Sequence, residues 1–161
     1  MIMDCNNLSV SQGSDVVEIW TDGGCKPNPG PGGWGVLLRY RGKERELSGG
    51  EKQTTNNRME LTAVAKALEV LRRPCFIKIY TDSEYVCKGM TEWCDVWLSR
   101  GWRKSSGGSL ILNVDLWRRV FELSVCHDVS WHWVKGHSGV IENERVDELA
   151  RRAREVVERE L

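Results

Sequence analysis

The stretch IYTDSE, residues 79 to 84, begins as an apolar strand and then places Asp82 where the next core residue is expected. The stretch IWTDGG, residues 19 to 24, repeats this order and places Asp22 at the same point. In open α/β sheets, ligands bind beyond the carboxyl ends of the strands. If the two strands are parallel neighbours, about 4.8 Å apart, both carboxylates face one crevice. The repeated pattern therefore predicts a shared acidic site at the edge of a parallel pair of strands.

The rest of the chain alternates strand and helix signals around this pair. Apolar runs bounded by turn residues predict strands at residues 16–21, 33–42, 43–50, 75–81 and 129–136. Helical spacing predicts helices at residues 54–71, 83–90, 91–100 and 113–124, and a last helix from about residue 143. This order predicts an α/β fold with an antiparallel hairpin at one side and parallel neighbours at the centre.

Composition indicates one domain. A chain of 161 residues with 40% hydrophobic content is long enough for one core and short for two. We expect a flexible arm at residues 1–15 and a single domain at residues 16–161, without a signal peptide or membrane span. Six scattered cysteines predict free thiols and a cytoplasmic protein. Because 23 basic residues balance 23 acidic ones, net charge gives no bulk attraction to a polyanion.

Two further acids are predicted to point inward. Glu60 precedes Val64 and Ala67 by four and seven residues, so it lies on the apolar stripe of its helix. Asp147 flanks the apolar stripe of the last helix. Clustered carboxylates raise one another's pKa and are costly to bury without a cation. Oxygen ligands suit hard divalent ions such as Mg²⁺ or Mn²⁺, so the pattern predicts a metal site.

Each acid also has an ordinary structural interpretation. Asp22 could support the glycine turn, Asp82 could cap the helix at residue 83, and Glu60 could answer the helix dipole. Asp147 could pair with Arg151 one turn later. Four such coincidences on four different elements favour a common site.

Five stretches together resemble bacterial ribonuclease H of type 1, in the same order and over roughly residues 16 to 154. They are TDGGCKPNPGPGGWG, TTNNRMEL, YTDSEYV, NVDLW and WVKGHSGVIENERVDELA. The resemblance implies a five-stranded mixed sheet in the order 3-2-1-4-5, with helices on both faces. It also implies that Asp22, Glu60, Asp82 and Asp147 hold two Mg²⁺ ions, with Mn²⁺ as the alternative, and that Asp22 bridges them.

By the same resemblance, the chain is expected to hydrolyse the RNA strand of an RNA–DNA hybrid, leaving 5′-phosphate and 3′-hydroxyl ends. Glu60 would also accept a hydrogen bond from the 2′-hydroxyl beside the scissile phosphate. His137 matches a loop histidine associated with proton transfer or product release, whereas His127 and His132 are expected to be structural. A monomer that needs no organic cofactor and no membrane is expected.

Substrate contacts follow from the resemblance as well. They are expected at Cys25, Asn28, Thr55, Asn56, Asn57, Arg58, Trp93 and Trp97. For Trp93 and Trp97, at i and i+4, core packing is an equally good interpretation of the spacing alone. The chain departs from the family at a weakly basic protrusion with only Arg100, Arg103 and Lys104, and at Glu84, which replaces an amide.

Three other functions deserve comparison. GPGGWG, residues 30–35, satisfies the GxGxxG pattern of dinucleotide-binding enzymes, but it leads into a strand, whereas that fingerprint must open a helix. A non-catalytic hybrid-binding module is expected to lack at least one of the four acids. A DNA-acting metal nuclease of the same fold class is disfavoured by TTNNRMEL and the histidine loop.

Overall fold

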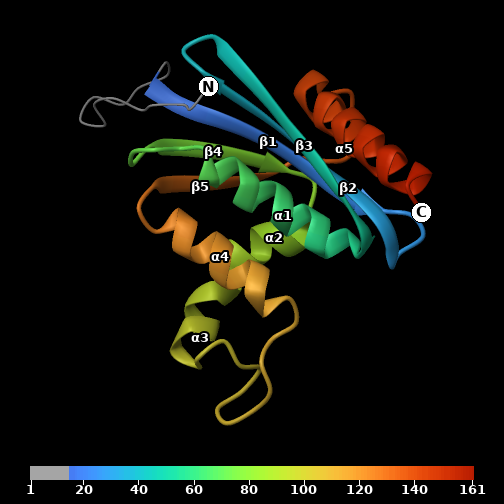
Figure 1. Ribbon diagram of the computed structural model, residues 1–161. Coiled ribbons are helices and arrows are strands. Elements are labelled where there is room, and N and C mark those ends of the chain that lie inside the picture. Colours follow the sequence, from blue (N-terminus) through green and yellow to red (C-terminus); the bar gives the residue numbers. More distant parts are fainter. Residues whose placement is uncertain (1–14) are drawn as a thin grey trace.

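A computed structural model describes residues 15–161, which form a five-stranded mixed sheet in the order β3-β2-β1-β4-β5 (Figure 1). The strands are β1 (Val16–Cys25), β2 (Gly30–Tyr40), β3 (Lys43–Thr54), β4 (Phe76–Thr81) and β5 (Asp128–Trp133). β2 pairs antiparallel with β1 and β3, whereas β4 pairs parallel with β1 and β5. The predicted sheet order, the hairpin side and the parallel centre are therefore confirmed.

Helices cover both faces of the sheet. They are α1 (Asn56–Glu69), α2 (Glu84–Lys88), α3 (Cys94–Ser99), α4 (Val114–Ser124) and α5 (Ile141–Arg159). α1 packs on one face and against α4, and α5 lies on the other face over β1, β2 and β3 (Figure 1). A π-helical turn, Gly89–Trp93, joins α2 to α3. The two helices predicted for residues 83–100 are therefore one helical segment with a π-helical middle.

The main core lies between the sheet and α1. Ile19, Leu38 and Leu61 are fully buried there, and Trp117 of α4 is fully buried in the same core. The indole N–H of Trp117 donates to the hydroxyl of Tyr85 at 2.8 Å. Gly89 packs directly on the Trp117 ring, because a Cβ at Gly89 would lie 1.9 Å from it. This contact holds the segment after β4 against α4.

Several boundary predictions need correction. β1 and β3 are longer than predicted, because each continues to pair with β2 beyond its predicted end. Cys75 is disulfide-bonded, so the prediction of free thiols is wrong there, whereas Cys25, Cys87, Cys94 and Cys126 are free. The predicted arm lies outside the described residues except for Asp15, which pairs with Arg41 at 2.7 Å. None of the helices in residues 15–161 is long and apolar enough to cross a membrane.

Candidate active site

The two repeated stretches meet where the parallel ladder ends. Thr21 pairs with Thr81, and Asp22 and Asp82 are the next residues on their chains. Asp82 follows the end of β4, as predicted. Asp22 lies inside β1 rather than at its end, because the antiparallel pairing with β2 continues through Asp22 and Gly35 to Cys25. The predicted meeting of the two carboxylates holds, because the parallel pair that aligns them ends at this level.

Glu60 reaches the same point from α1. Thr55 caps this helix by accepting a hydrogen bond from the backbone N–H of Arg58 at 3.2 Å. The helix packs closely on β1, since a Cβ at Gly23 would lie 2.4 Å from the backbone of Met59. Only a glycine at position 23 allows this approach, which brings Glu60 beside Asp22.

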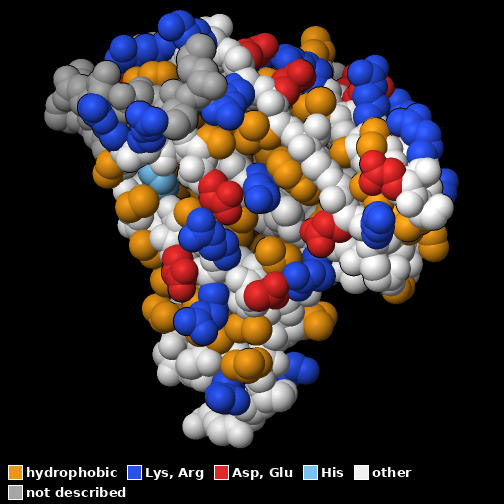
Figure 2. Space-filling view, in the orientation of Figure 1, with side chains coloured by type: hydrophobic (Ala, Val, Ile, Leu, Met, Phe, Trp, Pro, Cys, Tyr) orange, Lys and Arg blue, Asp and Glu red, His pale blue; other side chains and the backbone are white. Residues whose placement is uncertain are grey.

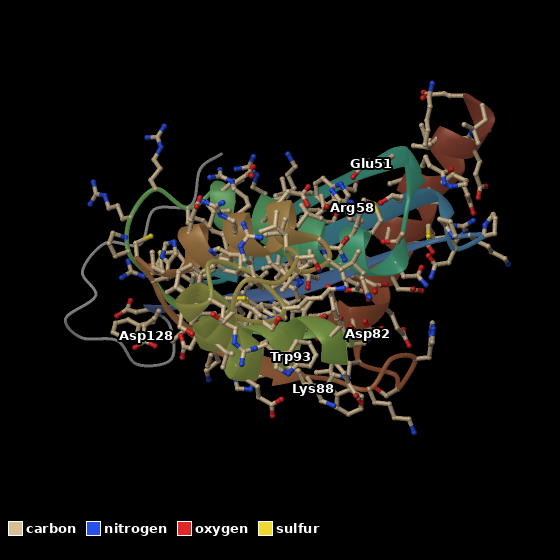
Figure 3. All side chains as sticks on the ribbon, turned by 90° about the horizontal axis from the view of Figure 1, so that it is seen from below. Glu51, Arg58, Asp82, Lys88, Trp93 and Asp128 are labelled. Carbon is tan, nitrogen blue, oxygen red and sulfur yellow. The ribbon has the colours of Figure 1, made fainter. Side chains whose placement is uncertain are left out.

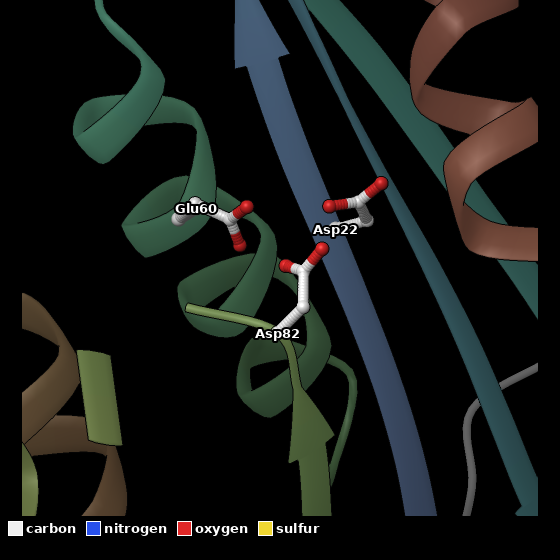
Figure 4. A group of neighbouring side chains, drawn as sticks. All are labelled: Asp22, Glu60 and Asp82. Atoms are coloured by element: carbon white, nitrogen blue, oxygen red, sulfur yellow. The ribbon is translucent and has the colours of Figure 1, made fainter. Parts of the chain in front are cut away.

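The three carboxylates point toward one another (Figure 4). One carboxylate oxygen from each of Asp22, Glu60 and Asp82 lies within 4.8 Å of the others. Glu60 is 8% exposed, and its buried Oε2 has no hydrogen-bond partner among the described residues. Asp147 of α5 lines the same cleft, of about 820 Å³, and interacts with Asp22. All four predicted acids therefore meet at one site.

Burial and mutual repulsion make this cluster reluctant to ionise. Burial, followed by the neighbouring Asp82 and Asp147, raises the pKa of Asp22 to about 8. Burial and the charges of Asp22 and Asp82 raise the pKa of Glu60 well above its usual value. The pKa of Asp82 is raised by burial and by Asp147. A bound cation would stabilise the ionised carboxylates, and it would thereby offset both the cost of ionising a buried group and the repulsion between like charges.

The ordinary structural roles do not account for Asp82 and Asp147. Ser83, not Asp82, caps α2, since its hydroxyl accepts from the backbone N–H of Val86 at 3.1 Å. Arg151 pairs with Glu148 and Glu155 instead of Asp147. Within residues 15–161, none of the four acids forms an ion pair with a lysine or arginine. An all-oxygen set with an orphaned buried oxygen fits a hard divalent cation.

Comparison with known proteins gives the family. The family model described as RNase H matches residues 14–155. The chain belongs to the ribonuclease H family. Ribonuclease H of Gluconobacter oxydans is 60% identical over 139 residues, covering 86% of this chain and 92% of that protein. Ribonuclease H of Halorhodospira halophila is 62% identical over 135 residues, covering 84% of this chain and 90% of that protein. The predicted membership is therefore confirmed.

Solved structures agree with this membership. A type 1 ribonuclease H with the type 2 active-site motif is 34% identical, with a TM-score of 0.76 over 88% of this chain and 72% of that protein. A ribonuclease H1 solved in complex with an RNA/DNA hybrid is 23% identical, with a TM-score of 0.64 over 87% of this chain and 97% of that protein. At 23% identity, the second likeness shows the fold alone. The family is metal-dependent, in keeping with the acidic cluster.

The loop after β1 is tied to the start of α1. The backbone N–H of Cys25 donates to Oδ1 of Asn56 at 2.8 Å, and the N–H of Asn56 donates to Oδ1 of Asn28 at 3.3 Å. Cys25, Asn56 and Asn57 line the cleft beside the carboxylates. Four of the predicted substrate contacts, Cys25, Asn28, Asn56 and Asn57, thus lie together at one wall. Their role as substrate ligands stays a prediction.

The other predicted contacts lie outside the cleft lining. Arg58 is held by α4, because its guanidinium donates to both carboxylate oxygens of Asp115, at 3.0 and 2.7 Å. Trp93 lies with Lys88 on the helical segment after β4, apart from Arg58 on α1 (Figure 3). The rings of Trp93 and Trp97 are half-buried and lie 5.6 Å apart, and Trp97 also packs on Trp117. Packing against neighbouring rings thus accounts for part of the buried surface of both tryptophans. Substrate contact by Trp93 and Trp97 stays a prediction.

The three histidines occupy different surroundings. His137 is exposed in the loop between β5 and α5, has a positive φ of 56°, and lines the cleft. His127 accepts a hydrogen bond from the backbone N–H of Cys75 at 3.0 Å. His132 stacks on Tyr80 with ring centroids 5.1 Å apart. Of the three, His137 alone lines the cleft, and its catalytic role stays a prediction.

The sequence pattern does not predict three basic residues that line the cleft, Lys26, Arg151 and Arg154. Arg151 and Arg154 follow Asp147 by four and seven residues on α5, so helical spacing alone would have placed them on the same face. The loop that carries Lys26 is fixed by long-range pairing, since its backbone N–H donates to the carbonyl of Pro31 at 3.1 Å. Sequence spacing gives no comparable signal for Lys26.

Proposed function

We propose that this chain hydrolyses the RNA strand of RNA–DNA hybrids at the cluster of Asp22, Glu60, Asp82 and Asp147, with Mg²⁺ as the metal and Mn²⁺ as a substitute. The observation that carries the proposal is the orphaned Glu60 oxygen among converging carboxylates, on the fold of ribonuclease H. The all-oxygen set favours these hard ions over softer metals.

The acids and the polar residues beside them have different proposed roles. Asp22, which lies among the other acids, would be a central ligand for the metal, and Glu60, Asp82 and Asp147 would complete the set. When bound, two ions activate the attacking water and stabilise the leaving 3′-oxygen. No protein nucleophile is then needed. Cys25, Asn28, Asn56 and Asn57 at the adjoining wall are polar partners for the minor groove.

The proposal extends to the domain organisation, the oligomeric state and the location of the protein. We propose that residues 16–161 form a single domain that acts as a monomer without an organic cofactor. The support is that one five-stranded sheet carries a cleft that all four acids line, among the residues that the structure describes. We propose a cytoplasmic location on the four free thiols, which are typical of reducing compartments, and the disulfide-bonded Cys75 is the exception to this pattern.

The test compares three matched duplexes of one sequence, RNA–DNA, RNA–RNA and DNA–DNA, in buffer with Mg²⁺. We expect cleavage of the RNA strand of the hybrid alone, with 5′-phosphate and 3′-hydroxyl ends on the products. Equal cleavage of the DNA duplex would indicate a DNA nuclease. Tight hybrid binding without any cleavage would indicate a binding module.

Replacing His137 with alanine is expected to slow turnover by about 10²-fold, the usual contribution of a positioned acid or base. Binding of Mg²⁺ and of hybrid should be unchanged, because His137 is exposed and lies on a loop outside the carboxylate cluster. Single-turnover cleavage and calorimetric Mg²⁺ titration measure the two effects separately. Replacement of the stacked His132, which lies outside the cleft lining, is the matched control. Loss of Mg²⁺ binding in the His137 variant would make it a ligand.

The protrusion formed by α3 and the loop after it is expected to bind nucleic acid weakly. Two of its arginines bond the loop itself: Arg100 donates to the Lys104 carbonyl at 3.0 Å and Arg103 to the Gly108 carbonyl at 2.8 Å. Figure 2 shows hydrophobic and neutral surface over much of this projecting part, and Leu112 is 72% exposed. The protrusion therefore offers few basic side chains to phosphates, only Arg100, Arg103 and Lys104.

Replacing Ser105, Ser106 and Ser109 with lysine is expected to lower KM several-fold and to steepen its salt dependence. Each added phosphate contact increases the slope of log affinity against log salt by about 0.9. The value of kcat should stay within about twofold, because the carboxylates lie on the sheet and not in the loop. Steady-state kinetics across a KCl series measure both. A KM that does not respond would show that the loop stays off the nucleic acid.

A further inference from the structure

The acidic cleft has a basic wall. Beyond the carboxylates, α5 contributes Arg151 and Arg154 to the lining, and the loop after β1 contributes Lys26. Glu84 lines the cleft from α2 and carries the opposite charge. The charge of the cleft is therefore distributed unevenly, with all three of its cations on α5 and the β1–β2 loop.

Two of these three cations have donors to spare. Lys26 is exposed and forms no ion pair within residues 15–161. Among the described residues, Arg154 donates only through Nη1, to Glu158 at 2.6 Å, and its other guanidinium nitrogens have no partner there. Arg151 differs, because both of its Nη atoms are taken by Glu148 and Glu155. Lys26 and Arg154 together therefore present a net positive charge to the cleft.

Close packing of α5 brings these two residues to the same end of the cleft. A Cβ at Gly33 would lie 2.6 Å from the backbone nitrogen of Arg154, so the helix rests directly on β2. Gly33 and Gly24 are partners across β2 and β1, one residue before Cys25. Lys26 follows Cys25 in the chain, and the charge of Arg154 acts on the Cys25 thiol. The Arg154 side chain is held there, since it is 20% exposed.

We propose that Lys26 and Arg154 bind one backbone phosphate of the nucleic acid substrate, next to the carboxylate cluster and on its α5 side. A guanidinium presents several donors to phosphate oxygens, and a lysine adds a point charge. This phosphate site offsets the repulsion between the acidic cluster and a polyanion, and it supplies part of the contact that the weakly basic protrusion lacks. The inference rests on the proposed function, because it concerns the same substrate.

The test uses Lys26→Gln, Arg154→Gln and the double variant of the full chain. Arg152→Gln is the matched control, since Arg152 lies on the same helix, is 72% exposed and pairs with Glu148 outside the cleft lining. Hybrid binding is measured across a KCl series in EDTA, so that no turnover is needed. KM and kcat are then measured with Mg²⁺.

We expect the double variant to weaken hybrid binding about tenfold, the usual loss for a charge-assisted contact. The slope of log affinity against log salt should fall by about 0.9, the value for one phosphate. The KM of the double variant should rise in parallel, while its kcat stays within about twofold of the wild-type value. Arg154→Lys, which keeps the positive charge, should restore most of the salt slope that Arg154→Gln loses. Lys26→Gln changes an exposed residue, so its effect is free of folding defects.

An unchanged salt slope in the double variant would overturn the phosphate site, as would an equal loss in Arg152→Gln. A wild-type chain that binds hybrid but never cleaves it would instead overturn the proposed function. In that case the EDTA binding series would still decide whether Lys26 and Arg154 contact a phosphate. The two failures are therefore distinguishable.

Discussion

Replacing Asp22 with asparagine is expected to reduce hybrid cleavage by about 10³-fold or more and, in metal-free buffer at pH 8, to raise the midpoint of thermal unfolding. Activity is expected to fall because the variant loses a carboxylate that would hold the metal, and central electrostatic groups carry effects of this size. Stability rises because a carboxylate that is 9% exposed, beside two like charges, no longer has to ionise. Asp82→Asn should act in the same direction.

The pH dependence gives the sign of the stability effect. The pKa of Asp22 is raised from 3.8 to about 8 in the folded chain, so the folded state binds this proton more tightly than the unfolded state does. The stabilisation is complete below about pH 4 and is lost as pH rises toward 8. Metal-free wild-type protein should therefore lose stability over this range more steeply than Asp22→Asn.

Thermal unfolding from pH 4 to pH 9 and single-turnover cleavage with Mg²⁺ measure the two halves of this prediction. Asp128→Asn is the control, because Asp128 is an exposed acid at the start of β5 and lies outside the cleft lining. Asp128→Asn should change neither the midpoint of thermal unfolding nor the rate of cleavage. Near wild-type turnover in Asp22→Asn would refute the metal-ligand assignment.

Replacing Gly33 with alanine is expected to destabilise the fold by about 3 kcal/mol, at the upper end for overpacking, and to lower activity at least tenfold. The added Cβ would lie 2.2 Å from the carbonyl oxygen of Ala150, so α5 must move away from β2. Asp147 sits on the same helix one turn earlier and would move with it. Chemical denaturation and hybrid cleavage measure the two effects.

Gly24→Ala is the matched control for stability. Gly24 pairs with Gly33 across the two strands, but a Cβ there would meet only the Asn56 side chain, at 3.4 Å. This is ordinary contact, so the free energy of unfolding should change by less than about 1 kcal/mol. If Gly33→Ala were as stable as Gly24→Ala, close packing of α5 would not hold the site together.

Local sequence patterns predict the acids well because each sits on a regular repeat. Asp22 and Asp82 follow matching apolar runs, and Glu60 lies on the apolar stripe of its helix. The strand order came from resemblance to the family, not from these patterns. The position of Asp22 inside β1 could not be predicted, because it depends on pairing with β2, which is a long-range contact.

Other features escape a sequence pattern for similar reasons. The spacing of Trp93 and Trp97 fits a regular helix, but the packing of Gly89 on Trp117 accompanies a π-helical turn there. Lys26 reaches the cleft through the β1–β2 pairing, and Arg154 through the contact of α5 with Gly33. Long-range contacts therefore place Lys26 and seat α5 against β2, whereas the position of Arg154 on the Asp147 face of α5 follows from helical spacing.

The most direct test of the carboxylate site is the effect of Mg²⁺ on thermal unfolding, measured without substrate at pH 8 for wild-type protein and Asp22→Asn. An ion that binds only the folded chain stabilises it by RT ln(1 + [Mg²⁺]/Kd), so the wild-type midpoint should rise steadily with Mg²⁺ concentration. The Asp22→Asn midpoint should start higher and respond little. An equal rise in both proteins would contradict the claim that these carboxylates hold the metal.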